Sequence, residues 1–305
     1  MTVSSFKTGY DGVSFLAGND YYLGIVGLFA GGDPLTNTID YVTIASTGNA
    51  TDFGDLTQSK QVSSSGASST RGLFNGGYTG AASNVIEYVT ITSKGNAIDF
   101  GDLLEANYSN AGCSNSTRAI IAGGPFAQVR IQYVTIATIG NAINFGDLTG
   151  NSTNFAGCAS TTRGIFGAVG GGSDNINYIT IATTGNATSF GNLSVSRAGI
   201  GSCSSSTRGL FTGGATPSNV IDYITIATTG NATDFGDLTQ ARGYVASCSS
   251  ETRGLTGGGY TGSVVVNTVD YVTINTTGNA TDFGDLTVSR YGLAALSGAH
   301  GGLAA

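Results

Sequence analysis

Several residue types on which active sites commonly depend are scarce in this chain. Among 305 residues there is one histidine, His300, and there is no tryptophan. A single histidine excludes metal centres that need several imidazoles. It also argues against Ser-His-Asp catalysis, because no other side chain of this type is present to act as the base. These counts predict a protein that is not an enzyme.

Charged residues are also scarce. Asp, Glu, Lys and Arg make up 10% of the chain, against about 25% in a typical soluble domain. The net charge is -7, and nine of the twelve Lys and Arg residues occupy two recurring repeat positions instead of forming one cluster. Binding to phosphates requires clustered basic side chains. We therefore expect no interaction with nucleic acid.

Long hydrophobic runs are absent. No segment approaches 18 consecutive apolar residues, and the opening "MTVSSFKTGYDG" lacks the apolar core of a signal peptide. We expect neither membrane insertion nor signal-directed secretion. Four cysteines are spaced 45 residues apart, so they mark one repeat position instead of a disulfide framework: Cys113, Cys158, Cys203 and Cys248. We interpret them as small buried hydrophobes and predict no metal and no cofactor.

Glycine, by contrast, is abundant, with 49 residues, and much of it belongs to one repeat. The segment "STGNATDFGDL" at residues 46–56 returns in close copies five more times. Each copy follows a "YVTI" or "YITI" segment, and the tyrosines that open these segments are spaced 47, 45, 45, 45 and 48 residues apart: Tyr41, Tyr88, Tyr133, Tyr178, Tyr223 and Tyr271. Units of this length are typical of propeller blades.

Each unit contains four segments with strand character. The first consists of Gly, Ala, Ser and Cys, which suits an innermost strand where blades crowd together. A short apolar strand, a strand with period-two alternation and a strand after the "TGNA" turn follow. The terminal "SRYGLAALSG" matches the first segment, which the first unit lacks. We predict an all-β, six-bladed propeller over residues 23–305, closed by this C-terminal strand, after an unrepeated lead at residues 1–22.

The repeat resembles the Kelch-type β-propeller repeat. A glycine doublet follows the second strand in five units, at Gly31/Gly32, Gly76/Gly77, Gly123/Gly124, Gly213/Gly214 and Gly258/Gly259. The tyrosine lies about ten residues later and an aromatic about twelve beyond it. The chain departs from this pattern in having phenylalanine for tryptophan and Ala168/Val169 in place of one doublet. The low-charge Thr/Asn/Gly repeats are also similar to propeller repeats in virion proteins of tailed phages.

Length variation is confined to one part of the unit. The distance from each repeat tyrosine to the next "TR" arginine is always 30 residues. The distance from that arginine to the tyrosine of the following "YVTI" or "YITI" segment varies from 15 to 18 residues. Insertions therefore fall between the second and third strands, on the same face as the sequence-variable links between blades. We predict that this face binds a ligand, with candidate contact residues Tyr78, Tyr108, Phe126, Gln128, Arg130 and Tyr260. The alternatives are unselected loop drift or, for some rings, packing between blades.

The recurring "DFGD" resembles a kinase magnesium motif, but no phosphate loop or catalytic loop accompanies it. We interpret its last aspartate as one part of a structural ring that hydrogen-bonds to backbone or arginine between blades, with Asn192 as a neutral copy. The aspartates are Asp55, Asp102, Asp147, Asp237 and Asp285. The arginines are Arg71, Arg118, Arg163, Arg208 and Arg253.

The expected function follows from these features and from the resemblance to virion proteins. We expect a non-enzymatic structural or binding module of a phage virion, such as a tail fibre, baseplate or capsid decoration. Its variable face would bind a host-surface glycan or a neighbouring virion protein, and residues 1–22 would attach it to other virion or surface proteins. A bacterial cell-surface or secreted adhesin is the alternative. A carboxylate-dependent glycan-cleaving enzyme is a third.

Overall fold

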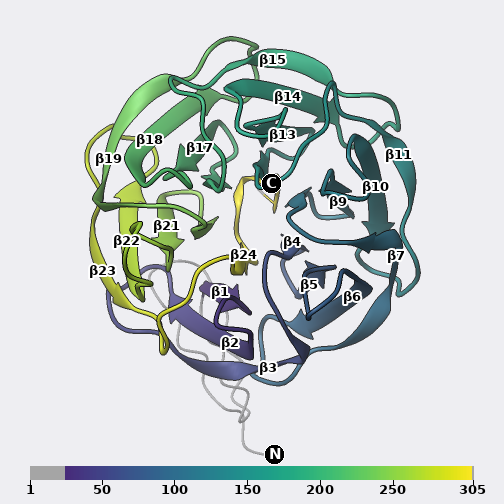
Figure 1. Cartoon of the computed structure of the whole chain (residues 1–305), viewed down its shortest axis with the longest axis horizontal. Helices are drawn as coiled ribbons and strands as arrows, with labels where there is room; N and C mark the ends of the chain where they lie inside the picture. The colour runs from purple at the N-terminus through teal and green to yellow at the C-terminus, as the bar shows by residue number, and fades with distance from the viewer. Residues whose placement is uncertain (1–24, 304–305) are drawn as a thin grey trace, which may run out of the picture.

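The computed structural model describes residues 25–303, which form six antiparallel sheets arranged in a ring around a central axis (Figure 1). Each sheet has four strands that follow one another from the axis outward. The chain is therefore an all-β, six-bladed propeller with four-stranded blades, which confirms the prediction from the repeat spacing. The predicted lead at residues 1–22 lies outside the described residues.

Equivalent strands recur at the same distance from the axis in blades 1 to 6. In that order the innermost strands are β24 (Ala294–Ser297), β4 (Ser64–Ala67), β8 (Ala111–Ser114), β12 (Ala156–Ala159), β16 (Gly201–Ser204) and β20 (Ala246–Ser249). The second strands are β1 (Val26–Ala30), β5 (Arg71–Asn75), β9 (Arg118–Ala122), β13 (Arg163–Gly167), β17 (Arg208–Thr212) and β21 (Arg253–Gly257). The third strands are β2 (Thr36–Thr43), β6 (Ser83–Thr90), β10 (Arg130–Thr135), β14 (Asn175–Thr180), β18 (Ser218–Thr225) and β22 (Thr268–Thr273). The outermost strands are β3 (Thr51–Lys60), β7 (Ile98–Asn107), β11 (Ile143–Asp147), β15 (Thr188–Asn192), β19 (Thr233–Arg242) and β23 (Thr281–Asp285), and a short 3-10 helix, η1 (Gly301–Leu303), ends the described chain.

The small residues of the innermost strands match small residues of the next blade. Each cysteine packs against the glycine at the second position of the next blade's second strand; a Cβ built on Gly164 would lie 2.8 Å from Sγ of Cys113. Where the innermost strand has Gly66 in place of cysteine, the next blade has Ala119 in place of glycine. Volume removed on one side of the contact is restored on the other, which keeps the interface filled.

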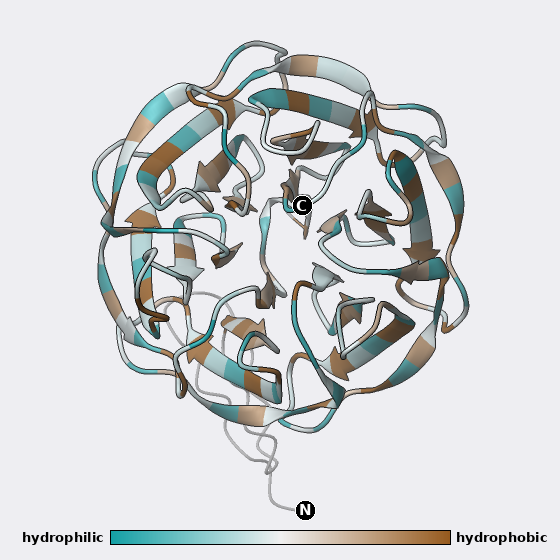
Figure 2. Ribbon diagram, viewed as in Figure 1, coloured by the Kyte–Doolittle hydropathy of each residue, from teal (hydrophilic) through white to brown (hydrophobic). Residues whose placement is uncertain are grey.

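Each blade carries the same aromatic pair on its two outer strands. The tyrosine of the third strand meets the phenylalanine of the fourth edge to face, with ring centroids 5.8 to 6.2 Å apart. The phenylalanine is buried in all six blades, whereas the tyrosine is partly exposed. Hydrophobic and polar residues alternate along these strands, as the hydropathy colouring shows (Figure 2). Burial of one face of each strand supplies the core between blades.

Contacts between blades explain the near-constant "TGNA" turns. Oδ1 of each turn asparagine accepts a hydrogen bond from a backbone N–H of the preceding blade, and Asn141 and Asp102 are joined in this way at 3.0 Å. Beside this bond Gly101 has φ +148°, and a Cβ there would lie 2.5 Å from the carbonyl oxygen of Gly140. Glycine is required because the two backbones approach so closely. Six blade interfaces need six copies of the contact, and hence of the motif.

The ring is closed by the C-terminal strand, as predicted. β24 pairs antiparallel with β1, with Gly27–Ala30 opposite Ala294–Ser297. The turn contact also crosses this seam, because the N–H of Asp285 donates to Oδ1 of Asn49 at 3.1 Å. Closure supplies β1 with a partner on its inner side and protects an edge that would otherwise be free to pair with other chains.

Candidate functional site

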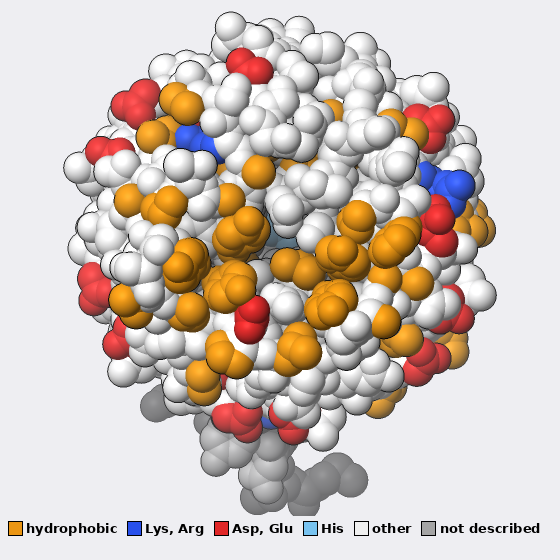
Figure 3. Space-filling model, viewed as in Figure 1, with side chains coloured by type: hydrophobic (Ala, Val, Ile, Leu, Met, Phe, Trp, Pro, Cys, Tyr) orange, Lys and Arg blue, Asp and Glu red, His pale blue; other side chains and the backbone are white. Residues whose placement is uncertain are grey.

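The two faces of the ring use their loops differently. The variable face carries the loops between second and third strands and the links from one blade to the next (Figure 3). The constant face carries the "TR" loops and the "TGNA" turns, whose polar groups hydrogen-bond to adjacent blades. The repeated polar residues of the constant face therefore form contacts between adjacent blades. The loops of the variable face are available to contact other molecules.

At the centre of the variable face the six links form a closed ring of backbone hydrogen bonds. One residue of each link has a left-handed conformation, with φ between +49° and +63°: Val62, Ser109, Asn154, Gly199, Tyr244 and Gly292. Each donates its N–H to the carbonyl of the corresponding residue in the preceding link, at 2.5 to 3.0 Å, and Val62 completes the circle by donating to Gly292. This circle frames the opening of the central channel, which we call the channel mouth.

Three of the predicted contact residues form one aromatic cluster beside the channel mouth. Tyr78 comes from the loop after β5, Tyr108 from the link after β7 and Phe126 from the loop after β9. The ring centroids of Tyr78 and Tyr108 are 5.5 Å apart and those of Tyr108 and Phe126 are 6.1 Å apart. Phe126 is 58% exposed. The cluster thus offers an aromatic surface to solvent.

Gln128 belongs to the same loop as Phe126, and Arg130 follows at the start of the next strand. Gln128 is exposed and has φ +46°. Arg130 begins β10 and forms a salt bridge with Glu105 of β7, in which both side chains are partly exposed. Such a pair contributes little to stability because water screens it. Both residues are accessible to a ligand that covers the cluster.

The sixth predicted residue, Tyr260, belongs to a second cluster, two members of which the sequence analysis did not identify. Tyr291 lies between Tyr244 and Tyr260, with ring centroids 5.8 and 5.9 Å away. The O–H of Tyr291 donates to the carboxylate of Asp33 at 2.6 Å, and this bond, with burial, raises the pKa of Tyr291 to about 12. Both missed tyrosines occupy links between blades, the same feature that identified Tyr108. Orange side chains gather on either side of the central depression in Figure 3.

Between the two clusters the channel mouth leads into a funnel. Cavities of about 70 and 90 Å³ lie along it and share Ser63, Asn110 and Phe155 among their lining residues, so they are continuous. The other shared residues are Ile200, Val245 and Leu293. The residues that line these two cavities include no Asp, Glu, Lys, Arg or His.

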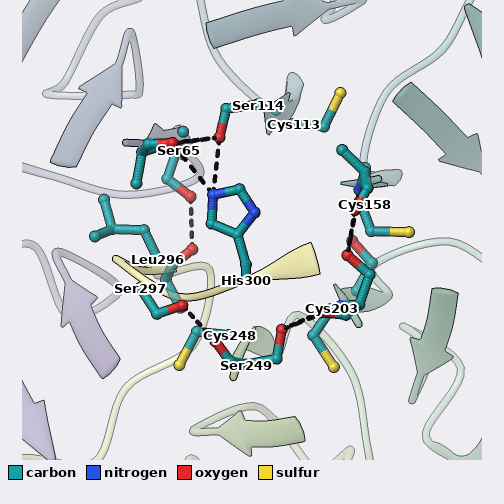
Figure 4. Close-up of a pocket in the computed structure, with 18 of the residues that line it drawn as sticks. Ser65, Cys113, Ser114, Cys158, Cys203, Cys248, Ser249, Leu296, Ser297 and His300 are labelled. Carbon is teal, nitrogen blue, oxygen red and sulfur yellow. Dashed lines mark hydrogen bonds between the residues drawn. The ribbon is translucent and has the colours of Figure 1, made fainter. Parts of the chain in front are cut away.

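The C-terminal tail blocks the funnel at the constant face. His300 lies there with Nε2 3.2 Å from the carbonyl oxygen of Ala67, and its Nδ1 accepts the N–H of Gly302 at 3.1 Å (Figure 4). Burial lowers the pKa of His300 to about 4, so the ring is neutral at pH 7. Because Nδ1 accepts, the proton belongs on Nε2, where it faces the Ala67 carbonyl. The funnel is therefore open only at the variable face.

The cysteine ring surrounds this closed end without facing it. The four sulfur atoms are directed away from the channel, toward the blade interfaces, whereas the hydroxyls of Ser114 and Ser249 bridge neighbouring innermost strands (Figure 4). Burial raises the pKa of Cys113 and of Cys203 to about 12, so these thiols are protonated at pH 7. Within residues 25–303 no three His, Cys, Asp or Glu side chains are arranged to hold a metal ion.

The chain was also compared with known proteins. No protein-family model and no curated protein matches it. In the part of the chain that the structure describes, no helix is long and apolar enough to cross a bilayer.

The residues of the predicted Asp/Arg ring form two separate sets of contacts. Each of the five arginines lies over the tyrosine of its own blade, 4.4 to 4.8 Å from the ring centroid, and donates to a backbone carbonyl of the next blade at 2.7 to 3.1 Å. The aspartates contribute the backbone N–H that the turn asparagines accept. Over residues 25–303 no salt bridge joins the two sets.

Buried ion pairs instead join blades through other residues. A base at the end of the outermost strand, or in the link that follows it, meets an acid that immediately precedes the tyrosine of the next blade. These pairs are Lys60 with Glu87, Arg197 with Asp222, Arg242 with Asp270 and Arg290 with Asp40; in the three arginine pairs nitrogen and oxygen are 2.9 Å apart. All eight side chains are at most 3% exposed, so each charge depends on its partner for compensation.

At the two remaining interfaces both positions are neutral. Asn107 and Gln132 occupy them between blades 2 and 3, and Ser152 and Asn177 between blades 3 and 4. Cation and carboxylate are thus present together or absent together. The acceptor oxygen is kept in all six cases, because it receives a backbone N–H from the preceding blade at 2.6 to 3.2 Å.

Proposed function

We propose that this protein is a non-enzymatic binding module whose variable face recognises a surface glycan, and that it is a structural component of a phage particle. The observation that carries the first part is the pair of three-ring aromatic clusters on either side of the channel mouth. Aromatic rings with one apolar face and a polar edge suit stacking on the C–H faces of sugars. A neighbouring virion protein is the second candidate partner for the same surface.

The charges on this face support binding over glycan cleavage. Glycosidases use two carboxyl groups on either side of the scissile bond. Here Asp33 accepts the hydroxyl proton of Tyr291 in one cluster, and Glu105 is paired with Arg130 beside the other. These two acids therefore serve separate clusters, and the third acid of this face, Asp174, belongs to neither cluster and lies in the loop between β13 and β14. Their arrangement favours a surface that holds a saccharide without cleaving it.

We also infer that the repeats are of the Kelch type and that the particle component is a tail fibre, baseplate or decoration protein. The glycine doublets, the tyrosine and the buried phenylalanine support the first inference. The second inference rests on the resemblance of the low-charge Thr/Asn/Gly repeats to propeller repeats of tailed-phage virion proteins. Residues 1–22, which contain Phe6, Tyr10, Phe15, Tyr21 and Tyr22, remain the predicted attachment segment.

The variable face can be tested by binding to a panel of bacterial surface polysaccharides. The variant Tyr78→Ala/Phe126→Ala/Tyr260→Ala is expected to bind at least about tenfold more weakly than the native chain, because each aromatic contact is worth on the order of 1 kcal/mol. Ile98→Ala/Ile139→Ala/Ile143→Ala is the matched control, since these side chains are 53 to 66% exposed on the constant face. Equal binding by both variants would exclude the aromatic clusters as the contact surface. Absence of binding by the native chain would favour a protein partner.

Location separates the virion proposal from the adhesin alternative. Mass spectrometry of purified phage particles from an infected culture should detect peptides of this chain at a constant ratio to the major capsid protein. Recovery in the bacterial envelope fraction without enrichment in particles would contradict a virion role and favour an adhesin.

A further inference from the structure

The polar side chains of the channel mouth are concentrated in its first three links. The circle of backbone hydrogen bonds fixes the order of the six links around the axis. The first two links contribute Ser63, Ser109 and Asn110 together with Val62, and the third contributes Asn154 beside Phe155. The last three contribute Ile200, Val245 and Leu293, with the ring of Tyr244 at the rim. A ligand in this opening would meet hydrogen-bonding groups on one side and hydrocarbon on the other.

Asn110 is the unusual member of the polar side. It is 6% exposed, and neither Oδ1 nor Nδ2 has a hydrogen-bond partner within residues 25–303. In four of the other blades this position is occupied by an apolar residue: Phe155, Ile200, Val245 or Leu293. An unpaired buried amide destabilises a fold, because it has lost its hydrogen bonds to water without gaining others. Both amide atoms are also shielded from solvent, so Asn110 holds an amide with unused donors and acceptors just behind the funnel lining, where packing alone would favour a hydrocarbon side chain.

The shape of the funnel restricts what can enter. His300 and η1 block the constant-face end, so a polymer cannot thread through, and only a chain end or a side group fits. The residues lining the two cavities carry no charge, which disfavours an ionic ligand because a buried charge would lack a partner. The ligand group is accordingly small, uncharged and amphipathic.

We propose that the funnel binds the N-acetyl group of a terminal N-acetylhexosamine. The N–H and C=O of the acetamido group match the acceptor and donor of the Asn110 amide, which reaches them by a rotation of its side chain into the funnel. The acetyl methyl lies against Ile200 and Val245, and the sugar ring lies at the rim near Tyr244. This inference rests on the proposed glycan-binding function and names the sugar class and the residue that selects it.

The test compares methyl N-acetyl-β-glucosaminide and methyl N-acetyl-β-galactosaminide with methyl β-glucoside by isothermal titration and saturation-transfer NMR. We expect binding of at least one acetamido sugar, with the largest saturation transfer at its acetyl methyl, and at least about tenfold weaker binding of the glucoside. Asn110→Leu should weaken acetamido-sugar binding by at least about tenfold, while its melting temperature rises by roughly 2 °C because the unpaired amide is removed. Asn151→Leu, at an exposed link residue outside the funnel lining, should change neither quantity.

Three outcomes would overturn the inference. Binding that is insensitive to the acetamido group or to Asn110→Leu would show that the amide does not select the ligand. Equal or tighter binding of an N-acetyllysine peptide would assign the funnel to acetylated protein. If no glycoside binds, the inference fails, whereas the glycan-binding role of the aromatic clusters is judged separately by the polysaccharide panel and the Tyr78→Ala/Phe126→Ala/Tyr260→Ala variant.

Discussion

Deleting residues 292–305 is expected to abolish cooperative thermal unfolding. The deletion removes β24, whose four residues pair with β1, together with Leu293 and Leu296, which are at most 6% exposed. Lost apolar burial and hydrogen bonding amount to about 5 kcal/mol or more, which is comparable to the whole stability of many domains. The unpaired inner edge of β1 would in addition promote association between chains. Calorimetry and light scattering measure both effects.

A synthetic peptide of residues 289–305 provides the control for that experiment. Added in excess to the truncated chain during refolding, it should restore a calorimetric transition, because a strand supplied in trans can occupy the same edge. A peptide carrying Leu296→Asp should not restore it, since position 296 is buried against blade 2. A truncated chain that unfolds cooperatively at the native melting temperature would show that closure by β24 is dispensable.

The architecture was predictable because the sequence pattern of each strand and turn occurs in several copies along the chain. Six tyrosines at nearly constant spacing gave the number of blades, and the small-residue segment at the C-terminus indicated closure with β1. The strand order and the two faces followed from an alternating up-and-down path. Errors that would obscure a strand in a single copy are averaged out when the same pattern recurs at a fixed period.

Contacts between blades were harder to predict, because the two partners lie in different units. "DFGD" is the most regular acidic motif, and we predicted that its last aspartate accepts hydrogen bonds between blades. In the structure these aspartates instead donate a backbone N–H to the turn asparagines. The acids that meet the bases stand directly before the tyrosine, and that position is Asp or Glu in four units and Gln or Asn in two, so regularity alone did not identify it. Tyr244 and Tyr291 were missed for a related reason, since their clustering with Tyr260 depends on how links and loops meet in space.

The six repeats nevertheless contain the information that connects these positions. Within this one chain, glycine replaces cysteine where alanine replaces glycine in the next blade, at Gly66 and Ala119. Likewise Asn107 and Gln132 are both neutral where other interfaces have a base and an acid. Matched changes of this kind indicate direct contact. The pattern of bases and acids in successive units of the sequence is therefore sufficient to pair Arg290 with Asp40.

That pairing leads to the second large effect. Arg290→Met is expected to lower the free energy of unfolding by about 3–5 kcal/mol, because it leaves the carboxylate of Asp40 buried without its cation. In the native chain Arg290 also donates to the carbonyls of Phe29 and Thr38 at 3.0 Å, so it joins the last blade to the first. Burial lowers the pKa of Arg290, and the charge of Asp40 opposes that shift, so the cation is retained through this contact.

The native interface between blades 2 and 3 suggests the matching rescue. Arg290→Asn combined with Asp40→Gln reproduces the neutral pair Asn107 and Gln132, and the N–H of Thr287 keeps an acceptor oxygen in place of the Asp40 carboxylate. We expect the double variant to regain most of the stability that either single change removes, leaving it within about 2 kcal/mol of the native chain. Urea unfolding of the four chains in this cycle measures the coupling. A double variant no more stable than the sum of its single changes would mean that the charges do not compensate each other, and that the shared pattern of the six interfaces has another cause.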